Sequence, residues 1–143
     1  MSPLPKSANL PKSANSAQLA NSAKSAVPDE VLWLEHIRAE FESLDMDRIM
    51  TCFTDDVVVQ YNALPPIRGA IALRLLLSER YQHLEDYRLK KELRLIHGPL
   101  LTVAVEASFR KQGRSYCSRI IEILTVQDRQ IARWDYVGIQ SEV

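Results

Sequence analysis

Three polar side chains in or beside strand-like stretches could take part in acid–base chemistry: Tyr61, Glu122 and Asp135. When a carboxyl group lies on the inner face of a strand, desolvation favours its neutral form unless a partner offsets the charge. Such a group can protonate a carbonyl or epoxide oxygen, or remove a proton from a bound molecule. A phenol can donate a hydrogen bond to an oxyanion, although it is a poor base at neutral pH. Residues of these types are therefore suited to proton transfer and to hydrogen bonding with an oxygen atom.

Three helices are expected to position these side chains from one side. A proline followed by two acidic residues at positions 28–30 favours a helix start, and apolar residues at helical spacing extend this helix to Leu44. A short second helix is predicted to run through Phe53, followed by an acidic turn at residues 55–56. A third helix is predicted over residues 70–83, where leucines repeat at helical spacing.

Five stretches have the residue types that are typical of strands: residues 57–61, 87–97, 100–110, 115–126 and 131–138. Pro65 and Pro66 end the first strand, and Gly69 lets the chain turn into the third helix. Short turns at Gly98 and Gly113 join the later strands, so we expect them to be antiparallel neighbours. The expected fold class is α+β, with a curved sheet wrapped around three helices.

The N-terminal segment differs in composition from the rest of the chain. Leu-Pro-Lys-Ser-Ala-Asn occurs in tandem at residues 4–9 and 10–15. This segment has too little apolar surface to offset the entropy of ordering it, so we predict a disordered tail over residues 1–27. It lacks the features of a secretory or transit peptide, which favours the cytoplasm. With 143 residues, 46% of them hydrophobic, the chain suits a single domain over residues 28–143.

Composition and charge argue against several classes of partner. No apolar run reaches the length of a membrane span, so none is expected. The tail holds Lys6, Lys12 and Lys24 and no acid, which leaves 15 basic residues against 18 acidic ones in the domain. A mildly acidic domain is a poor candidate for binding nucleic acid. The basic run at residues 88–94 is interrupted by Glu92, and we interpret it as a solvated strand face without a function.

The cysteines and histidines do not form a recognisable metal motif. Cys52 and Cys117 are the only cysteines, one expected on a helix and one in a strand, and we interpret both as reduced thiols. His36, His83 and His97 are far apart and have no acidic ligand set nearby. We therefore predict no metal site.

The order of elements resembles the nuclear transport factor 2-like superfamily, in particular its SnoaL-like branch, with limonene epoxide hydrolases and ketosteroid isomerases as related enzymes. Two stretches carry the resemblance. Residues 53–69 contain the first strand and the Pro-Pro turn, and residues 113–136 end in Ile-Ala-Arg-Trp-Asp-Tyr. The resemblance covers about residues 30–138. It implies a cone-shaped antiparallel or mixed sheet and no cofactor.

The resemblance also implies which residues line a pocket. The stretch from Gly113 to Trp134 matches the epoxide hydrolase pattern without gaps, which places Glu122 on the pocket side. Ile121 and Ile123 then lie on the convex face, where exposed apolar residues favour a homodimer. On the strand before it, Val105, Ala107 and Phe109 are expected to face inward. The residues expected to bind the substrate are Tyr116, Ser118, Ile120, Trp134, Phe109 and Phe41.

Two residues gain a catalytic role from the resemblance. In the epoxide hydrolases the closing acid helps to activate the attacking water, which implies this role for Asp135. Here one residue is missing between Trp134 and Asp135, so there are two alternatives: Asp135 faces inward as a base, or Trp134 and Tyr136 face inward as an aromatic wall. Tyr61 falls where ketosteroid isomerases carry their catalytic aspartate. The Arg-x-Asp of the epoxide hydrolases has no counterpart in residues 103–107.

The leading hypothesis is a cofactor-free isomerase, cyclase, dehydratase or epoxide hydrolase that acts on a hydrophobic oxygenated molecule in natural-product biosynthesis. Glu122 and Asp135 are its acid–base candidates, and an ion pair of Glu122 with Arg38 or Arg74 is the structural alternative. The second hypothesis is a non-catalytic binding or dimerisation module. Carboxylates that are all held in salt bridges would favour a binding module. A filled cone would favour a dimerising scaffold, and an open cavity would count against it.

Overall fold

The computed structural model describes residues 27–143, in which three helices are combined with one sheet. The chain divides into two units, Met1–Leu32 and Trp33–Val143. Helix α2 (Asp29–Glu42) begins in the first unit, and the second unit holds all the other elements. The sequence repeats lie outside the described residues, and the extent of the tail and the domain boundary stay predictions. No described helix is long and apolar enough to cross a membrane.

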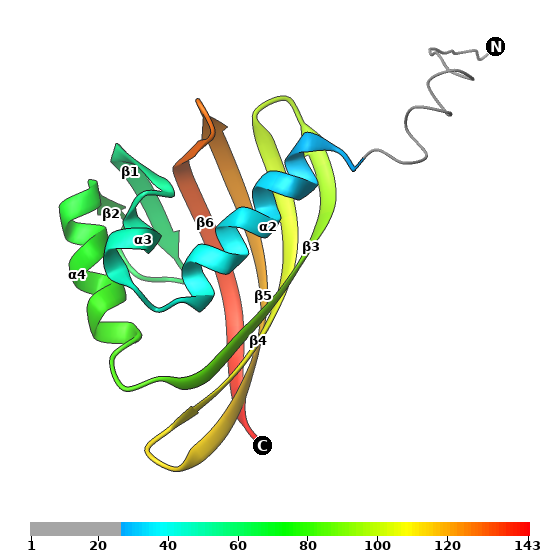
Figure 1. Cartoon of the computed structure of the whole chain (residues 1–143). Coiled ribbons are helices and arrows are strands. Elements are labelled where there is room, and N and C mark those ends of the chain that lie inside the picture. Colours follow the sequence, from blue (N-terminus) through cyan, green and yellow to red (C-terminus); the bar gives the residue numbers. More distant parts are fainter. Residues whose placement is uncertain (1–26) are drawn as a thin grey trace. The chain divides into compact units, whose positions relative to one another are not determined.

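Six strands form one curved mixed sheet in the order β2-β1-β6-β5-β4-β3 (Figure 1). The strands are β1 (Phe53–Tyr61), β2 (Ile67–Arg68), β3 (Glu85–His97), β4 (Leu100–Lys111), β5 (Arg114–Gln127) and β6 (Gln130–Glu142). Strands β3 to β6 are antiparallel neighbours, as their short turns predicted. Strand β1 runs parallel to β6 and antiparallel to β2. The α+β fold class and the mixed sheet are confirmed.

The helices cover the concave face of this sheet (Figure 1). Leu34, Ile37 and Phe41 of α2 are buried, as their helical spacing predicted. They belong to one core cluster with inward residues of β1, β4, β5 and β6, for example Val103 of β4 and Trp134 of β6. The core therefore fills the space between the helices and one half of the curved sheet.

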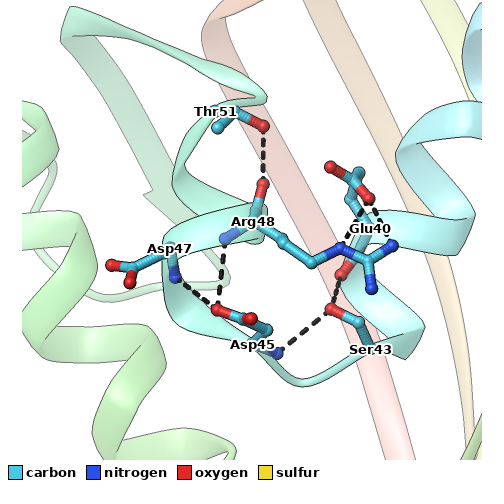
Figure 2. A network of polar contacts seen from close by, with 6 residues as sticks. All are labelled: Glu40, Ser43, Asp45, Asp47, Arg48 and Thr51. Carbon is cyan, nitrogen blue, oxygen red and sulfur yellow. Dashed lines mark hydrogen bonds and ion pairs between the residues drawn. The ribbon is translucent and has the colours of Figure 1, made fainter.

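Helix α3 (Met46–Met50) is fixed to α2 by a polar network (Figure 2). The carboxylate of Asp45 caps α3 by accepting hydrogen bonds from the backbone N–H groups of Asp47, at 2.9 Å, and Arg48, at 3.3 Å. The Arg48 guanidinium reaches back to Glu40 of α2, with a nitrogen–oxygen distance of 2.6 Å. The two helices are thus joined by an ion pair as well as by a short turn.

The structure corrects several element boundaries. The second helix ends at Met50, and Phe53 begins β1 because Phe53 pairs with Ile131 of β6 and is buried. The acidic residues 55–56 lie within β1, where a shift in pairing with β6 leaves them exposed. Helix α4 (Ala70–Arg80) ends three residues earlier than predicted. The two-residue strand β2 was missed, because it exists only through its pairing with β1.

Candidate functional site

A cavity of about 440 Å³ opens on the concave side of the sheet, between α2, α4 and strands β1 and β3 to β6. Its wall includes four tyrosines: Tyr61, Tyr81, Tyr87 and Tyr136. Such a volume is in the range of sites that hold small molecules. The interior of the fold is therefore not completely filled, which counts against a purely structural scaffold.

Strand alternation brings most of the expected binding residues to this cavity. Ser118, Ile120 and Glu122 line it from β5, and Phe109 lines it from β4 together with Val105 and Ala107. Phe41 and Trp134 complete its apolar wall. Tyr116 is the exception, because it lies outside the cavity and stacks on the ring of Phe109 with 5.5 Å between centroids.

The orientation of strand β6 decides between the two alternatives for its acid. Tyr136 lies opposite Glu122 and faces the cavity, whereas Asp135 lies opposite Ile123, which is exposed. The Asp135 carboxylate accepts two hydrogen bonds from the Arg133 side chain, each 3.0 Å long. Trp134 and Tyr136 therefore form an aromatic wall, and Asp135 does not reach the cavity.

Glu122 is buried with both carboxylate oxygens occupied. Lys91 Nζ donates to Oε1 at 2.7 Å, and Trp134 Nε1 donates to Oε2 at 2.9 Å. The Lys91 and Glu122 side chains are only 6% and 3% exposed. A charged pair with so little contact with water is costly to bury, and only close geometry with further hydrogen bonds compensates for this.

The partner of Glu122 differs from the two arginines expected from the sequence. Arg38 pairs with neighbours on its own helix, and Arg74 pairs with Asp47. Lys91 had been assigned to a solvated face, which is wrong for this residue. The signal was present in the alternation of β3, because Tyr87, Leu89 and Lys91 share one strand face and all line the cavity.

Three of the cavity's tyrosines, Tyr81, Tyr87 and Tyr136, have a raised pKa. Burial raises the pKa of Tyr81 well above its ordinary value, and a hydrogen bond with Tyr87 adds to this effect. Burial likewise raises the pKa of Tyr87 and of Tyr136. The Tyr61 and Tyr136 rings stack with centroids 4.1 Å apart. The cavity thus presents phenols that can hydrogen-bond to an oxygenated ligand without becoming charged.

Metal-ligating and thiol chemistry find no support in the described residues. In residues 27–143 no group of three or more His, Cys, Asp or Glu side chains is placed to hold a metal ion. Both cysteines are free; Cys52 is buried, in the turn after α3 instead of on a helix, and Cys117 is exposed on β5. Burial raises the pKa of the Cys52 thiol to about 12, which makes it a poor nucleophile.

Solved structures share this fold at low sequence identity. An LEH-like epoxide hydrolase from M. tuberculosis is 16% identical and has a TM-score of 0.65, with 76% of this chain and 81% of that chain covered. The epoxide hydrolase/cyclase-like enzyme SalBIII, from pyran ring formation in polyether salinomycin, is 15% identical and has a TM-score of 0.66, with 80% and 98% covered. A protein of ketosteroid isomerase-like fold from Catenulispora acidiphila is 10% identical and has a TM-score of 0.65, with 78% and 86% covered.

These likenesses show the nuclear transport factor 2-like fold and nothing more. Identities this low carry no statement about activity. No curated protein matches the chain. The sequence pattern of the SnoaL-like domain matches residues 34–134, which is most of the part that folds around the cavity. The chain therefore belongs to the SnoaL-like domain family.

Proposed function

We propose that this protein is a cofactor-free acid–base enzyme, an isomerase, cyclase, dehydratase or epoxide hydrolase, and that Lys91 and Glu122 carry its chemistry. The substrate is a hydrophobic oxygenated small molecule that fills the cavity. The observation that carries the proposal is the buried Lys91–Glu122 pair in a cavity wall that is mainly apolar and phenolic. A buried ion pair is weak support for stability, so its presence in a cavity favours a chemical role.

Lys91 and Glu122 have complementary roles in this proposal. The Lys91 ammonium group has three N–H donors and gives one to Glu122, which leaves donors for the oxygen of a bound molecule. Lys91 thus activates a carbonyl or epoxide oxygen, and Glu122 orients Lys91 and accepts a proton that the substrate releases. Tyr61 and Tyr136 position the oxygenated part of the substrate. Asp135 is not retained as a base.

A binding module without chemistry is the second candidate, and one observation favours it. Both oxygens of Glu122 already accept hydrogen bonds, and Asp135 is paired with Arg133, so both carboxylates that the sequence suggested are held in salt bridges. In this case the Lys91 ammonium group would only bind the oxygen of the ligand. The two candidates share the same ligand and differ in whether it is transformed.

The test compares the native protein with a Lys91→Met/Glu122→Gln double variant in a metabolite extract from the source organism. Removing both charges together avoids leaving one buried charge unpaired. An Arg133→Gln/Asp135→Asn variant is the matched control, because it removes an exposed ion pair. Circular dichroism establishes that each variant is folded.

Mass spectrometry then separates the candidates. If the native protein and the control consume a metabolite that the double variant leaves unchanged, the proposal of an enzyme is supported. An unchanged product mass indicates isomerisation or cyclisation, and a mass shifted by water indicates hydrolysis or dehydration. If a species co-purifies with the native protein but none is consumed, the enzyme proposal is wrong and the binding module replaces it.

Two further parts of the function belong to the same proposal. The likeness to an enzyme of pyran ring formation supports a place in natural-product biosynthesis. We also propose a homodimer through the convex sheet face, where Ile121, Ile123, Val137 and Ile139 are 50%, 39%, 67% and 73% exposed. Residence in the cytoplasm stays a prediction.

A further inference from the structure

Two basic side chains line the cavity without an acidic partner. Arg80 is the last residue of α4, and Lys111 is the last residue of β4. Among the described residues, neither side chain forms a salt bridge, in contrast to the cavity's third cation, Lys91. Glu79 is the one further acid in the wall. Because Lys91 and Glu122 neutralise each other, the remaining charge of the cavity wall is positive.

Arg80 is held in position by an aromatic ring. Its guanidinium carbon lies 4.3 Å from the centroid of the Tyr61 ring, which is itself stacked on Tyr136. The cation–π contact with the ring does not use up the N–H donors of the guanidinium group, so they remain available to a carboxylate or phosphate. An arginine placed this way loses little side-chain freedom when it binds an anion, which favours binding.

We propose that the ligand of this cavity is an amphipathic acid whose anionic group binds Arg80 and is attracted by Lys111. Its apolar body lies along Tyr81, Tyr87 and Phe109, and its oxygenated end reaches Lys91. The inference rests on the proposed function only in that the cavity binds a small molecule. A carboxylate and a phosphate monoester offer the same oxygen acceptors to Arg80, so either can supply the anion.

The test uses three probes that share one apolar body: 4-phenylbutanoate, 4-phenylbutyl phosphate and the uncharged 4-phenylbutan-1-ol. Trp134 lies in the cavity wall and reports binding through its fluorescence. A Trp33→Phe variant removes the other tryptophan, which is buried outside the cavity wall. All variants are made in the full chain with this substitution.

The expected result is a preference for an anionic probe over the alcohol of about tenfold, because the Arg80 guanidinium forms a charge-assisted hydrogen bond to the anion. Arg80→Gln removes most of this preference and leaves the affinity for the alcohol unchanged. Lys111→Gln lowers the preference by a smaller factor than Arg80→Gln does. Salt weakens binding of the anions only. Arg74→Gln is the matched control, because Arg74 is on the same helix but outside the cavity wall. The stronger of the two anionic probes identifies the source of the anion.

Equal affinity of the native protein for all three probes overturns the inference and leaves the cavity as a small-molecule site. A preference for anions that Arg80→Gln does not reduce also overturns it. Binding of none of the probes contradicts an amphipathic acid of this size as the ligand. The proposed function is tested separately, by whether consumption of a metabolite requires Lys91 and Glu122. The inference and the proposed function can therefore fail independently.

Discussion

The properties of the cavity depend first on how one buried carboxylate is satisfied. Glu122 has a charged donor on one oxygen and an indole N–H on the other, so it needs neither water nor a ligand in order to be buried. The same two contacts fix the positions of Lys91 and Trp134. A substitution at Glu122 therefore changes stability and site geometry together.

Glu122→Gln is expected to lower the free energy of unfolding by about 3 kcal/mol, because it leaves the Lys91 ammonium buried without a counter-charge. Urea denaturation measures the loss. In the Lys91→Met/Glu122→Gln double variant we expect most of the stability to return, to within about 1 kcal/mol of the native protein. Asp135→Asn is the exposed control and should change stability by less than about 0.5 kcal/mol. Equal losses in Glu122→Gln and Asp135→Asn would contradict the buried pair.

The tyrosines give a second prediction at the residue scale. Since burial raises the pKa of Tyr81 and Tyr87, the folded state keeps protons that the unfolded chain releases near pH 10. The unfolded state therefore binds fewer protons above this pH, and the free energy of unfolding falls as the pH rises further. Urea denaturation at about pH 9 and about pH 11, one unit on either side of the ordinary tyrosine pKa, measures the fall. A Tyr81→Phe/Tyr87→Phe variant should show a smaller fall, and an equal one would exclude this cause.

At the scale of elements, helix α2 is attached to the edge strand of the sheet by a side chain. The carboxylate of Glu42 accepts a hydrogen bond from the backbone N–H of Leu89 in β3, at 2.8 Å, and pairs with Arg38 at 2.9 Å. Strand β3 has a partner on one side only, so this contact satisfies a backbone group that would otherwise face solvent. The contact is made by the backbone of Leu89, whose side chain lines the cavity together with that of Lys91.

This contact predicts a dependence of stability on acid pH. The Leu89 N–H, and after it Arg38, lower the pKa of Glu42 below its ordinary value. The stabilisation is therefore complete above the pKa of the unfolded chain, about 4.3, and is lost as the pH falls through the folded pKa. Glu42→Gln should lower the free energy of unfolding by about 1 kcal/mol at pH 7, a value reduced for solvent screening, and by less in acid. Chemical denaturation at pH 7 and in acid measures the free energy of unfolding of both proteins. An equal effect of Glu42→Gln at the two conditions would contradict the prediction.

At the scale of the whole molecule, the two faces of the sheet differ in what they expose. The concave face encloses the cavity, and the convex face of β5 and β6 exposes four branched apolar side chains beside charged neighbours such as Arg119 and Arg133. A cluster of exposed apolar side chains on a sheet face is typical of a protein–protein interface. The opposite orientation of the two faces allows a dimer to form without closing the cavity.

The dimer proposal predicts the effect of a charge on the convex face. Ile121→Glu/Ile139→Glu should convert a dimer into a monomer, because two carboxylates would be desolvated at the interface. Sedimentation velocity over a range of protein concentrations measures the change. The control is Leu75→Glu, which places one charge on the exposed face of α4. A native protein that is monomeric at all concentrations would contradict the proposal.

The inward positions of Ser118, Ile120 and Glu122 were implied by the resemblance to the epoxide hydrolases, and all three line the cavity. The α+β class and the four antiparallel strands could be predicted from residue patterns and short turns, which are local properties. The first helix followed from its apolar spacing in the same way. Residues that gain their structure from a distant partner, such as Phe53 and strand β2, were assigned wrongly or missed.

Which charged side chains meet depends on packing between residues that are distant in sequence. Lys91 pairs with Glu122 across 31 positions of sequence. Strand alternation distinguishes Lys91 from the exposed lysine beside it but does not identify its partner. The orientation of Asp135 likewise followed from the pairing of β6 with β5, because neighbouring strand residues point to opposite faces and the register sets which face is inner. The sequence thus determined the pocket-forming fold, and three-dimensional packing determined the charged pair inside it.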